Sequence, residues 1–239
     1  MGPERRDVPV GNILQTAGFL VLCIGLLLRA GPLEAIDAGE NASLDGILQR
    51  MDRVYQGLTS YRAQFEQESE TKAFQRKTRS SGRVYFLKPG RMRWSYLEPE
   101  PREVYLSGEQ ILIYMPDRNQ VIEQRFTDAM PGMAPARLFM GVEELAGSFE
   151  ITLAEPDQQR EDAYCLRLIP KKKEALSVDE ILLWLGKQDL LPLRTASRDV
   201  LGNLTTLVFH DSEVNVPLKE ALFHFEIPPG TEVLNNPFR

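Results

Sequence analysis

Few of the side chains that most often perform catalysis or bind metals occur in this sequence. The chain has two histidines, His210 and His224, and two cysteines, Cys23 and Cys165. A zinc site needs three or four such ligands at short spacings, and a nucleophilic thiol needs a neighbouring base that activates it. The spacing of these residues fits neither arrangement. We interpret both histidines as structural residues of late strands, and Cys165, which lies in an apolar run, as an unreactive core thiol.

Other catalytic signatures are absent from the sequence. It contains no Gly-x-Ser-x-Gly nucleophile elbow, no phosphate-binding glycine loop and no dinucleotide-binding fingerprint. Carboxylates are plentiful, but they stand singly on the polar sides of expected strands, where solvation explains them. A basic run at 171–173 is explained in the same way. We therefore predict no enzymatic activity, no catalytic residue, no metal and no cofactor. A hydrolase is the least favoured alternative.

The first 36 residues differ in kind from the rest. Arg5 and Arg6 precede an uncharged, largely apolar stretch at 17–28. This stretch is shorter than the roughly 20 apolar residues that cross a bilayer as a helix, and it is typical of a secretory signal peptide. We predict a signal peptide at 1–36 and a single domain at 37–239, with an uncleaved anchor as the alternative. Leu22 does not fit the small residue that precedes a lipid-modified Cys23, so a lipoprotein start is not expected.

Net charge limits the possible binding partners, and cysteine content limits the possible disulfide bonds. The formal net charge is −6, which argues against binding nucleic acid or anionic membrane surfaces. Removal of a signal peptide that contains Cys23 would leave Cys165 as the one cysteine. No intramolecular disulfide is then expected, and the fold must be held by its hydrophobic core.

Period-two alternation is clearest around the Pro89-Gly90 turn. Val84 and Phe86 share one face before the turn, and Met92, Trp94 and Tyr96 share one face after it. This pattern predicts an antiparallel hairpin with one apolar side. The expected neighbours include a strand at 61–68, a polar link at 71–81, a strand at 111–115 that is apolar on both faces, and late strands at 204–210 and 222–227. Altogether we predict about ten or eleven strands in one strongly curved antiparallel sheet.

Two helical segments are expected beside this sheet. Ser43 is a plausible N-cap, and apolar residues recur at helical spacing from Leu44 to a helix end near Gly57. The stretch at 127–147 breaks the strand pattern, because it is rich in methionine, proline and glycine and predicts one or two short helical turns. It fits either a crossover that packs into the core or a movable lid over the apolar face.

Three stretches, at 82–94, 107–116 and 223–233, resemble the pattern of the LolA family of periplasmic outer-membrane lipoprotein carriers. With the leading helix and residues 65–67, the resemblance covers roughly 43–234. It implies a mainly β fold, an unclosed β-barrel with an N-terminal amphipathic helix and a short helical lid. It also implies a concave apolar face that receives lipoprotein acyl chains. The predicted lipid-binding residues are Phe65, Val84, Phe86, Met92, Trp94, Ile111 and Ile113, and the predicted lid residues are Lys88, Pro135, Leu138 and Phe139.

The resemblance also implies partners and a location. It predicts a periplasmic chaperone, a monomer in the simplest case, that takes lipoproteins from an inner-membrane ABC transporter of the LolCDE type. It would pass them to an outer-membrane acceptor of the LolB type. The family usually has an arginine where this chain has Lys88, and that arginine ties the lid through backbone carbonyls. An alternative of another class is a periplasmic regulator on the same half-barrel that senses lipid or lipoprotein and does not transfer it.

Overall fold

The computed structural model describes residues 43–125, 134–155, 158, 160–172 and 178–235. The chain divides into two compact units, Met1–Asn41 and Ala42–Arg239, and all described residues belong to the second. The predicted signal peptide and its boundary therefore lie outside the described residues. Within the described ranges, no helix has both the length and the apolar character that crossing a membrane requires.

The first helix, α1 (Leu44–Gly57), forms where the sequence predicts it. The Ser43 Oγ accepts a hydrogen bond of 3.2 Å from the backbone N–H of Gly46, which satisfies one of the free donors of the first turn. Ile47, Met51 and Tyr55 recur at four-residue spacing and are buried. This apolar stripe fixes which side of α1 faces the sheet.

The strands form one sheet of twelve, in the order β12-β6-β5-β4-β3-β2-β1-β11-β10-β9-β8-β7. Since β12 and β7 stand at its two edges, the sheet is an unclosed one, as predicted. The first six strands are β1 (Ser60–Thr71), β2 (Arg76–Leu87), β3 (Arg91–Glu98), β4 (Arg102–Ser107), β5 (Gln110–Met115) and β6 (Gln120–Arg125). The others are β7 (Phe149–Leu153), β8 (Ala163–Pro170), β9 (Val178–Gly186), β10 (Pro192–Asp199), β11 (Leu204–Val214) and β12 (Glu232–Asn235).

Three details differ from the sequence predictions. The polar link expected at 71–81 is the far end of a long hairpin, in which β1 and β2 pair up to the 3-10 turn η1 (Lys72–Phe74). The strand expected at 222–227 is instead the 3-10 turn η5 (Glu220–Phe223) followed by extended chain. The last strand, β12, pairs with β6 in parallel, so the sheet is not wholly antiparallel.

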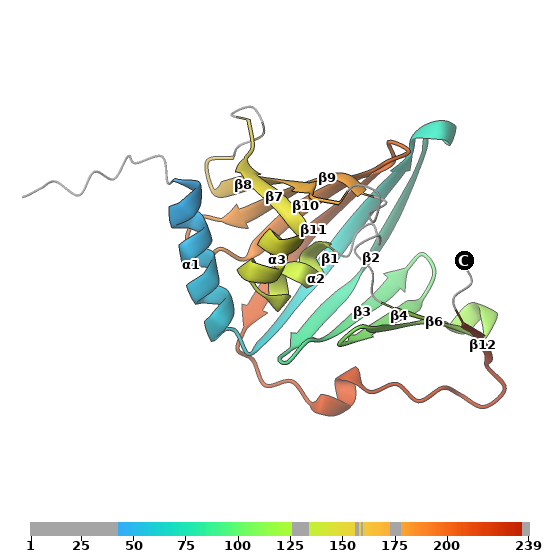
Figure 1. The fold of residues 1–239 in the computed structure, drawn as a ribbon. Helices are drawn as coiled ribbons and strands as arrows, with labels where there is room; N and C mark the ends of the chain where they lie inside the picture. The colour runs from blue at the N-terminus through green and yellow to red at the C-terminus, as the bar shows by residue number, and fades with distance from the viewer. Residues whose placement is uncertain (1–42, 126–133, 156–157, 159, 173–177, 236–239) are drawn as a thin grey trace, which may run out of the picture. The chain divides into compact units, whose positions relative to one another are not determined.

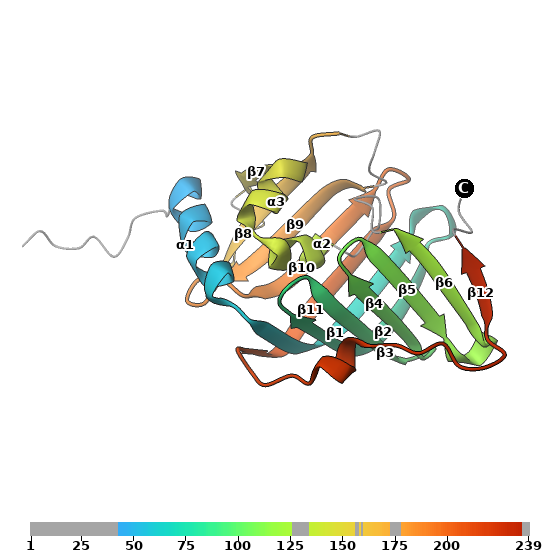
Figure 2. The same cartoon turned by 60° about the horizontal axis from the view of Figure 1, so that its bottom comes forward.

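Helices cover one face of the sheet. After the segment at 126–133, which lies outside the described residues, the chain forms α2 (Ala134–Met140) and α3 (Val142–Ser148). Figures 1 and 2 show α1, α2 and α3 on the same side of the sheet, and side chains from all three helices join one buried cluster with the strands. The predicted short helices are thus confirmed as a cover over the inner face of the sheet.

Candidate functional site: the covered inner face of the sheet

The strand register aligns the predicted lining residues across the sheet. Phe86 lies opposite Met92, and Val84 lies opposite Trp94, so the alternation in the central hairpin becomes two adjacent rows. Pairing of the neighbouring strands extends both rows. The first row contains Tyr61, Phe86, Met92, Leu106 and Ile111, and the second contains Ala63, Val84, Trp94, Val104 and Ile113.

The structure brings all seven predicted lining residues to this inner face. Six of them are buried, and the most exposed of the six, Trp94, is only 2% exposed. Ile113 is half-buried and packs against the same cluster. Tyr61 and Leu106 were not among the predicted residues. Their alternation was visible in the sequence, but only the register shows that they complete the row of Phe86.

Phe139 from α2 covers the first row. Its ring stacks on Phe86 with a centroid distance of 5.1 Å, and it lies 4.6 Å from the ring of Tyr61. It also meets Tyr55 of α1 edge-on at 5.8 Å. Leu138 beside it is fully buried. The side chain of Pro135, the third predicted lid residue, lies outside the described residues.

Lys88, the predicted lid residue beside the central turn, makes its side-chain hydrogen bonds to α1. Its ammonium donates hydrogen bonds to the backbone carbonyls of Tyr55 and Gln56, at 3.1 and 2.9 Å, and its backbone N–H donates to Thr59 O. Carbonyls in the last turn of a helix have no partner within the helix, and a cation there is favourable. Lys88 therefore ties the end of α1 to the hairpin, and these bonds go to α1 and not to α2.

A hollow of about 480 Å³ opens where α2 and α3 meet the hairpin turns. Arg137 stands at this opening, and its guanidinium donates to the Ser148 Oγ at 3.1 Å. Burial lowers the pKa of Arg137, while the nearby Glu144 acts in the opposite direction. The lining residues are Phe86, Lys88, Pro89, Gly90, Gly108, Glu109, Arg137, Phe139, Met140 and Glu144.

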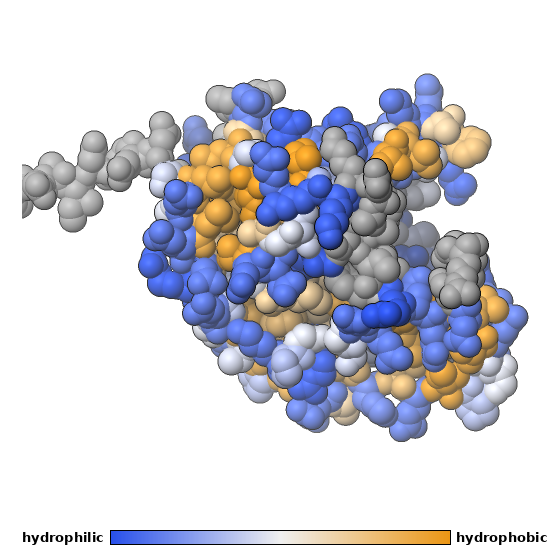
Figure 3. All heavy atoms as spheres, in the orientation of Figure 1, coloured by the Kyte–Doolittle hydropathy of each residue, from blue (hydrophilic) through white to orange (hydrophobic). Residues whose placement is uncertain are grey.

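Apolar side chains of α1, α3 and β7 also reach the molecular surface. Figure 3 shows apolar atoms beside α1, in the region where Figure 1 draws α3 and β7. The half-buried apolar residues of these elements that pack on the core include Leu44, Leu48, Val142 and Ile151. The outer surface of this region is therefore partly apolar.

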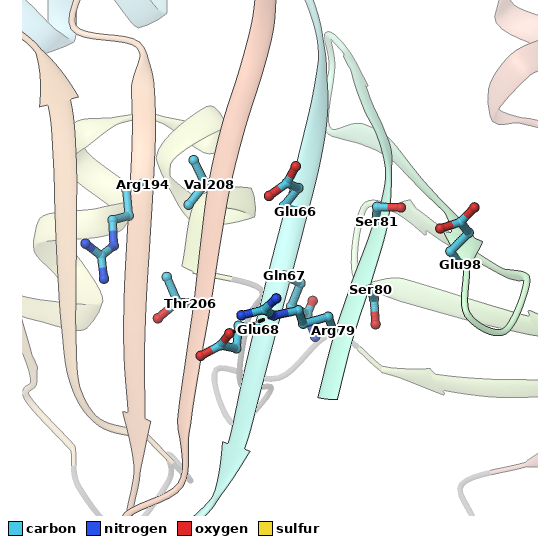
Figure 4. A pocket seen from close by; sticks show the side chains of 10 residues that line it. All are labelled: Glu66, Gln67, Glu68, Arg79, Ser80, Ser81, Glu98, Arg194, Thr206 and Val208. Carbon is cyan, nitrogen blue, oxygen red and sulfur yellow. Dashed lines mark hydrogen bonds and ion pairs between the residues drawn. The ribbon is translucent and has the colours of Figure 1, made fainter. Parts of the chain in front are cut away.

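A larger hollow of about 640 Å³ lies elsewhere and is lined mainly by polar groups. Figure 4 shows that β1, β2, β10 and β11 supply most of its side chains, with Glu68 and Arg79 joined by an ion pair. Glu66 and Glu68 alternate with Phe65 along β1, so they project from the opposite face of the sheet. Hydrogen bonds from Lys77 and then Arg79 lower the pKa of Glu68. This charged hollow does not suit an apolar ligand.

The titratable residues considered in the sequence offer no reactive centre. Cys165 is fully buried, and burial raises the pKa of its thiol to about 12, so it stays protonated. His210 lies in β11, a late strand as predicted, and its side chain is exposed. His224 is exposed as well and follows η5, so its placement in a strand was wrong. No group of three or more histidine, cysteine or carboxylate residues in the described part of the chain is arranged to hold a metal.

The sequence of this chain is similar to those of proteins from a known family. The family model described as "Outer membrane lipoprotein carrier protein LolA" matches residues 56–226. A protein of Alkalilimnicola ehrlichii named outer-membrane lipoprotein carrier protein is 31% identical over 92% of this chain and 94% of its own. One of the same name from Nitrosomonas europaea is 33% identical over 74% of this chain and 83% of its own.

A solved structure of similar fold supports the architecture. An uncharacterized conserved protein from Thermus thermophilus aligns with a TM-score of 0.50 and 18% sequence identity, over 80% of this chain and 98% of its own. The match of the family model, over most of the covered sheet, shows that the chain belongs to the LolA family.

Proposed function

We propose that this protein is a lipoprotein carrier that shelters acyl chains against the two apolar rows of its inner face. The observation that carries this proposal is the alignment of Phe86, Met92 and Trp94 with their neighbours into one continuous apolar surface under a separate helical cover. The relatives named as outer-membrane lipoprotein carrier proteins support the same role.

The energetics of such cargo suit an apolar face without catalytic groups. Acyl chains in water expose several hundred Å² of hydrocarbon, and at about 25 cal/mol per Å² their burial is worth on the order of 10 kcal/mol. In the structure, Phe139 and Leu138 occupy the space over the first row. Acyl chains must displace these side chains, so closure of the cover lowers the apparent affinity. A carrier needs this reduction because it must also release its cargo.

The proposed route follows from this cargo. Residues 1–36 direct export and are removed, and the domain at 37–239 works in the periplasm as a monomer. It receives lipoproteins from an inner-membrane transporter of the LolCDE type and delivers them to a LolB-type acceptor in the outer membrane. No enzymatic step is required, because transfer moves the cargo between apolar sites without changing a covalent bond.

A pair of substitutions in β3 tests the lipid-binding face. Met92→Glu places a carboxylate in the first row, and we expect the variant to lose co-elution with a triacylated lipoprotein. Leu97→Glu makes the same kind of change in the same strand at a side chain that is 51% exposed, and it should bind as the wild type does. Undiminished transport by a folded Met92→Glu protein would overturn the proposal.

A second measurement does not depend on any variant folding. Native mass spectrometry of the wild-type protein, isolated gently from the periplasm, should detect a complex with triacylated polypeptide. Repeated isolation of the protein without acylated cargo, under conditions that preserve a known carrier complex, would contradict the proposed function.

A further inference from the structure

Two buried N–H donors of the inner face have no hydrogen-bond acceptor within the described part of the chain. They are the indole Nε1 of Trp94 and the Nε of Arg102. An unpaired donor away from water is unfavourable, and most buried polar groups in proteins have a partner. Both side chains belong to the covered face that we propose as the acyl-chain site. They therefore point to an acceptor that arrives with the ligand.

The two donors belong to one aromatic cluster. Phe65 lies 5.1 Å from the ring of Trp94 and 4.9 Å from the ring of Tyr96. The guanidinium of Arg102 lies over the ring of Tyr96 at 4.1 Å, and Tyr96 pairs with Arg102 across β3 and β4. The Tyr96 hydroxyl donates to the Gln67 side chain at 3.0 Å and also interacts with the Arg102 guanidinium, but the Nε of Arg102 has no acceptor among the described residues.

The backbone beneath the cluster is adapted to this packing. Gly82 lies opposite Phe65 in the sheet, and a Cβ at this position would come within 2.8 Å of the Phe65 ring and 2.1 Å of the Ser95 carbonyl oxygen. The missing side chain lets the Phe65 ring lie close to β2, where it holds Trp94 and Tyr96 in position. Trp94 is buried while Arg102 is half-buried, so the cluster lies at the boundary of the apolar interior.

We propose that Trp94 and Arg102 donate hydrogen bonds to the ester and amide carbonyl oxygens that join the acyl chains to the polar end of the cargo. The proposal rests on the proposed function, because hydrocarbon chains themselves offer no acceptor. An indole N–H is a neutral donor, and its aromatic surroundings suit a neutral carbonyl better than an anion. The carbonyl end of the cargo then lies at the Tyr96–Arg102 pair, which borders the second row, and the chains extend across that row toward Phe86 and Met92.

A pair of ligands that differ only in these carbonyls tests the proposal. The probes are a synthetic lipopeptide with two hexadecanoyl ester chains on its S-glyceryl cysteine and the analogue with two hexadecyl ether chains. We expect the wild type to bind the ester about threefold to tenfold more tightly, as one or two hydrogen bonds would give. Trp94→Phe should reduce this preference, measured as the ratio of the ester affinity to the ether affinity within the same variant, whatever the change in overall affinity.

The second tryptophan of the chain provides a matched control. Trp184 donates its indole N–H to the Gln158 carbonyl at 2.9 Å, within a different buried cluster. Trp184→Phe removes the same chemical group without touching the proposed site, so the preference for ester over ether should persist. A preference lost equally in both variants would overturn the proposal.

The remaining outcomes separate this proposal from the proposed function. Equal binding of ester and ether by the wild type would overturn the role of Trp94 and Arg102 and leave the carrier function in place. Binding of neither ligand would overturn both. Hexadecyl phosphate serves as a further probe. If it binds more tightly than the ester, and Arg102→Met abolishes the difference, the site recognises an anion and the carbonyl assignment is wrong.

Discussion

Two of the helices that cover the inner face, α1 and α2, are held in different ways. Polar contacts reinforce the packing of α1, because Arg50 donates to the Lys187 carbonyl at 2.9 Å and Tyr55 donates its hydroxyl to the Leu190 carbonyl at 3.0 Å. The bonds from Lys88 add to these at the end of the helix. By contrast, α2 has seven residues and rests on the sheet through the rings around Phe139.

The connection after α2 differs as well. Gly141 separates α2 from α3 and has a φ of 124°, which residues with a side chain rarely adopt. Downstream, α3 is tied to the chain that follows β8, since Lys171 donates through its side chain to the Ala146 carbonyl and through its backbone to the Ser148 carbonyl. From this comparison we predict that α1 stays in place when cargo binds and that α2 is the part of the cover that moves.

The largest expected effect on stability comes from weakening the packing of α1 against the sheet. Met51 is fully buried on the inner side of α1, and Met51→Ala should lower the free energy of unfolding by about 2–5 kcal/mol. Urea denaturation followed by far-UV circular dichroism measures this change. A loss confined to α1, with the sheet equally stable, would show that α1 is no more integral to the fold than α2.

Phe139→Ala should act locally. Without the ring that covers Phe86 and Tyr61, amide exchange in α2 should accelerate about tenfold or more, while exchange in α1, which Phe139 meets only at Tyr55, should change much less. Binding of the ester lipopeptide should tighten, because a less stable cover competes less with the cargo. Equal acceleration in both helices would contradict the comparison.

Lys88→Met removes the ammonium that caps α1. Since the side chain is exposed, we expect a loss of about 1 kcal/mol in unfolding free energy and faster exchange in the last turn of α1. Lys88→Arg should keep most of the wild-type stability, because a guanidinium group also donates hydrogen bonds to carbonyls. Faster exchange in α2 instead would return Lys88 to the lid role that the family resemblance implies.

The last effect is absent at neutral pH and is expected only at alkaline pH. Burial raises the pKa of Tyr55 well above its ordinary value of 10.0. Because the folded pKa is the higher one, this contribution to stability is complete below about pH 10 and is lost as the pH rises toward the folded pKa. Tyr55→Phe should flatten the fall in stability by about 1.4 kcal/mol per pH unit in this window. Thermal unfolding of the wild type and of Tyr55→Phe between about pH 9 and 11 measures this difference. If the stability of both proteins falls equally with pH, the prediction is wrong.

Side-chain alternation was enough to predict the inner face. Phe86, Met92 and Trp94 each alternate with more polar or more exposed residues, and a strand buried on one side requires that pattern. The pattern could not predict register, which depends on contacts distant in sequence. The position of Phe65 over Gly82, the bonds from Lys88 to α1 and the surroundings of the two unpaired donors all depend on register.

Two prediction errors have the same physical origin. The stretch at 222–227 alternates like a strand, but Phe225 packs on the rings of Tyr105 and Tyr114 and the stretch is not paired as a strand. Residues 71–81 look like a polar link because neither side is apolar. There, cross-strand ion pairs, including those of Lys77 with Glu68 and Glu70, accompany the backbone pairing of β1 and β2. Composition alone does not distinguish such a hairpin from a loop.

The chain after β11 has a consequence for association between molecules. It crosses β3, where Arg93 donates to the Leu222 carbonyl, and then places β12 along β6. An uncovered edge strand offers a row of backbone groups that can template sheet growth from one copy to the next. Here the rim next to β6 is occupied by only four residues, Glu232–Asn235, led by a carboxylate. Because β12 occupies the edge of β6, that edge is not available to pair with the sheet of another molecule.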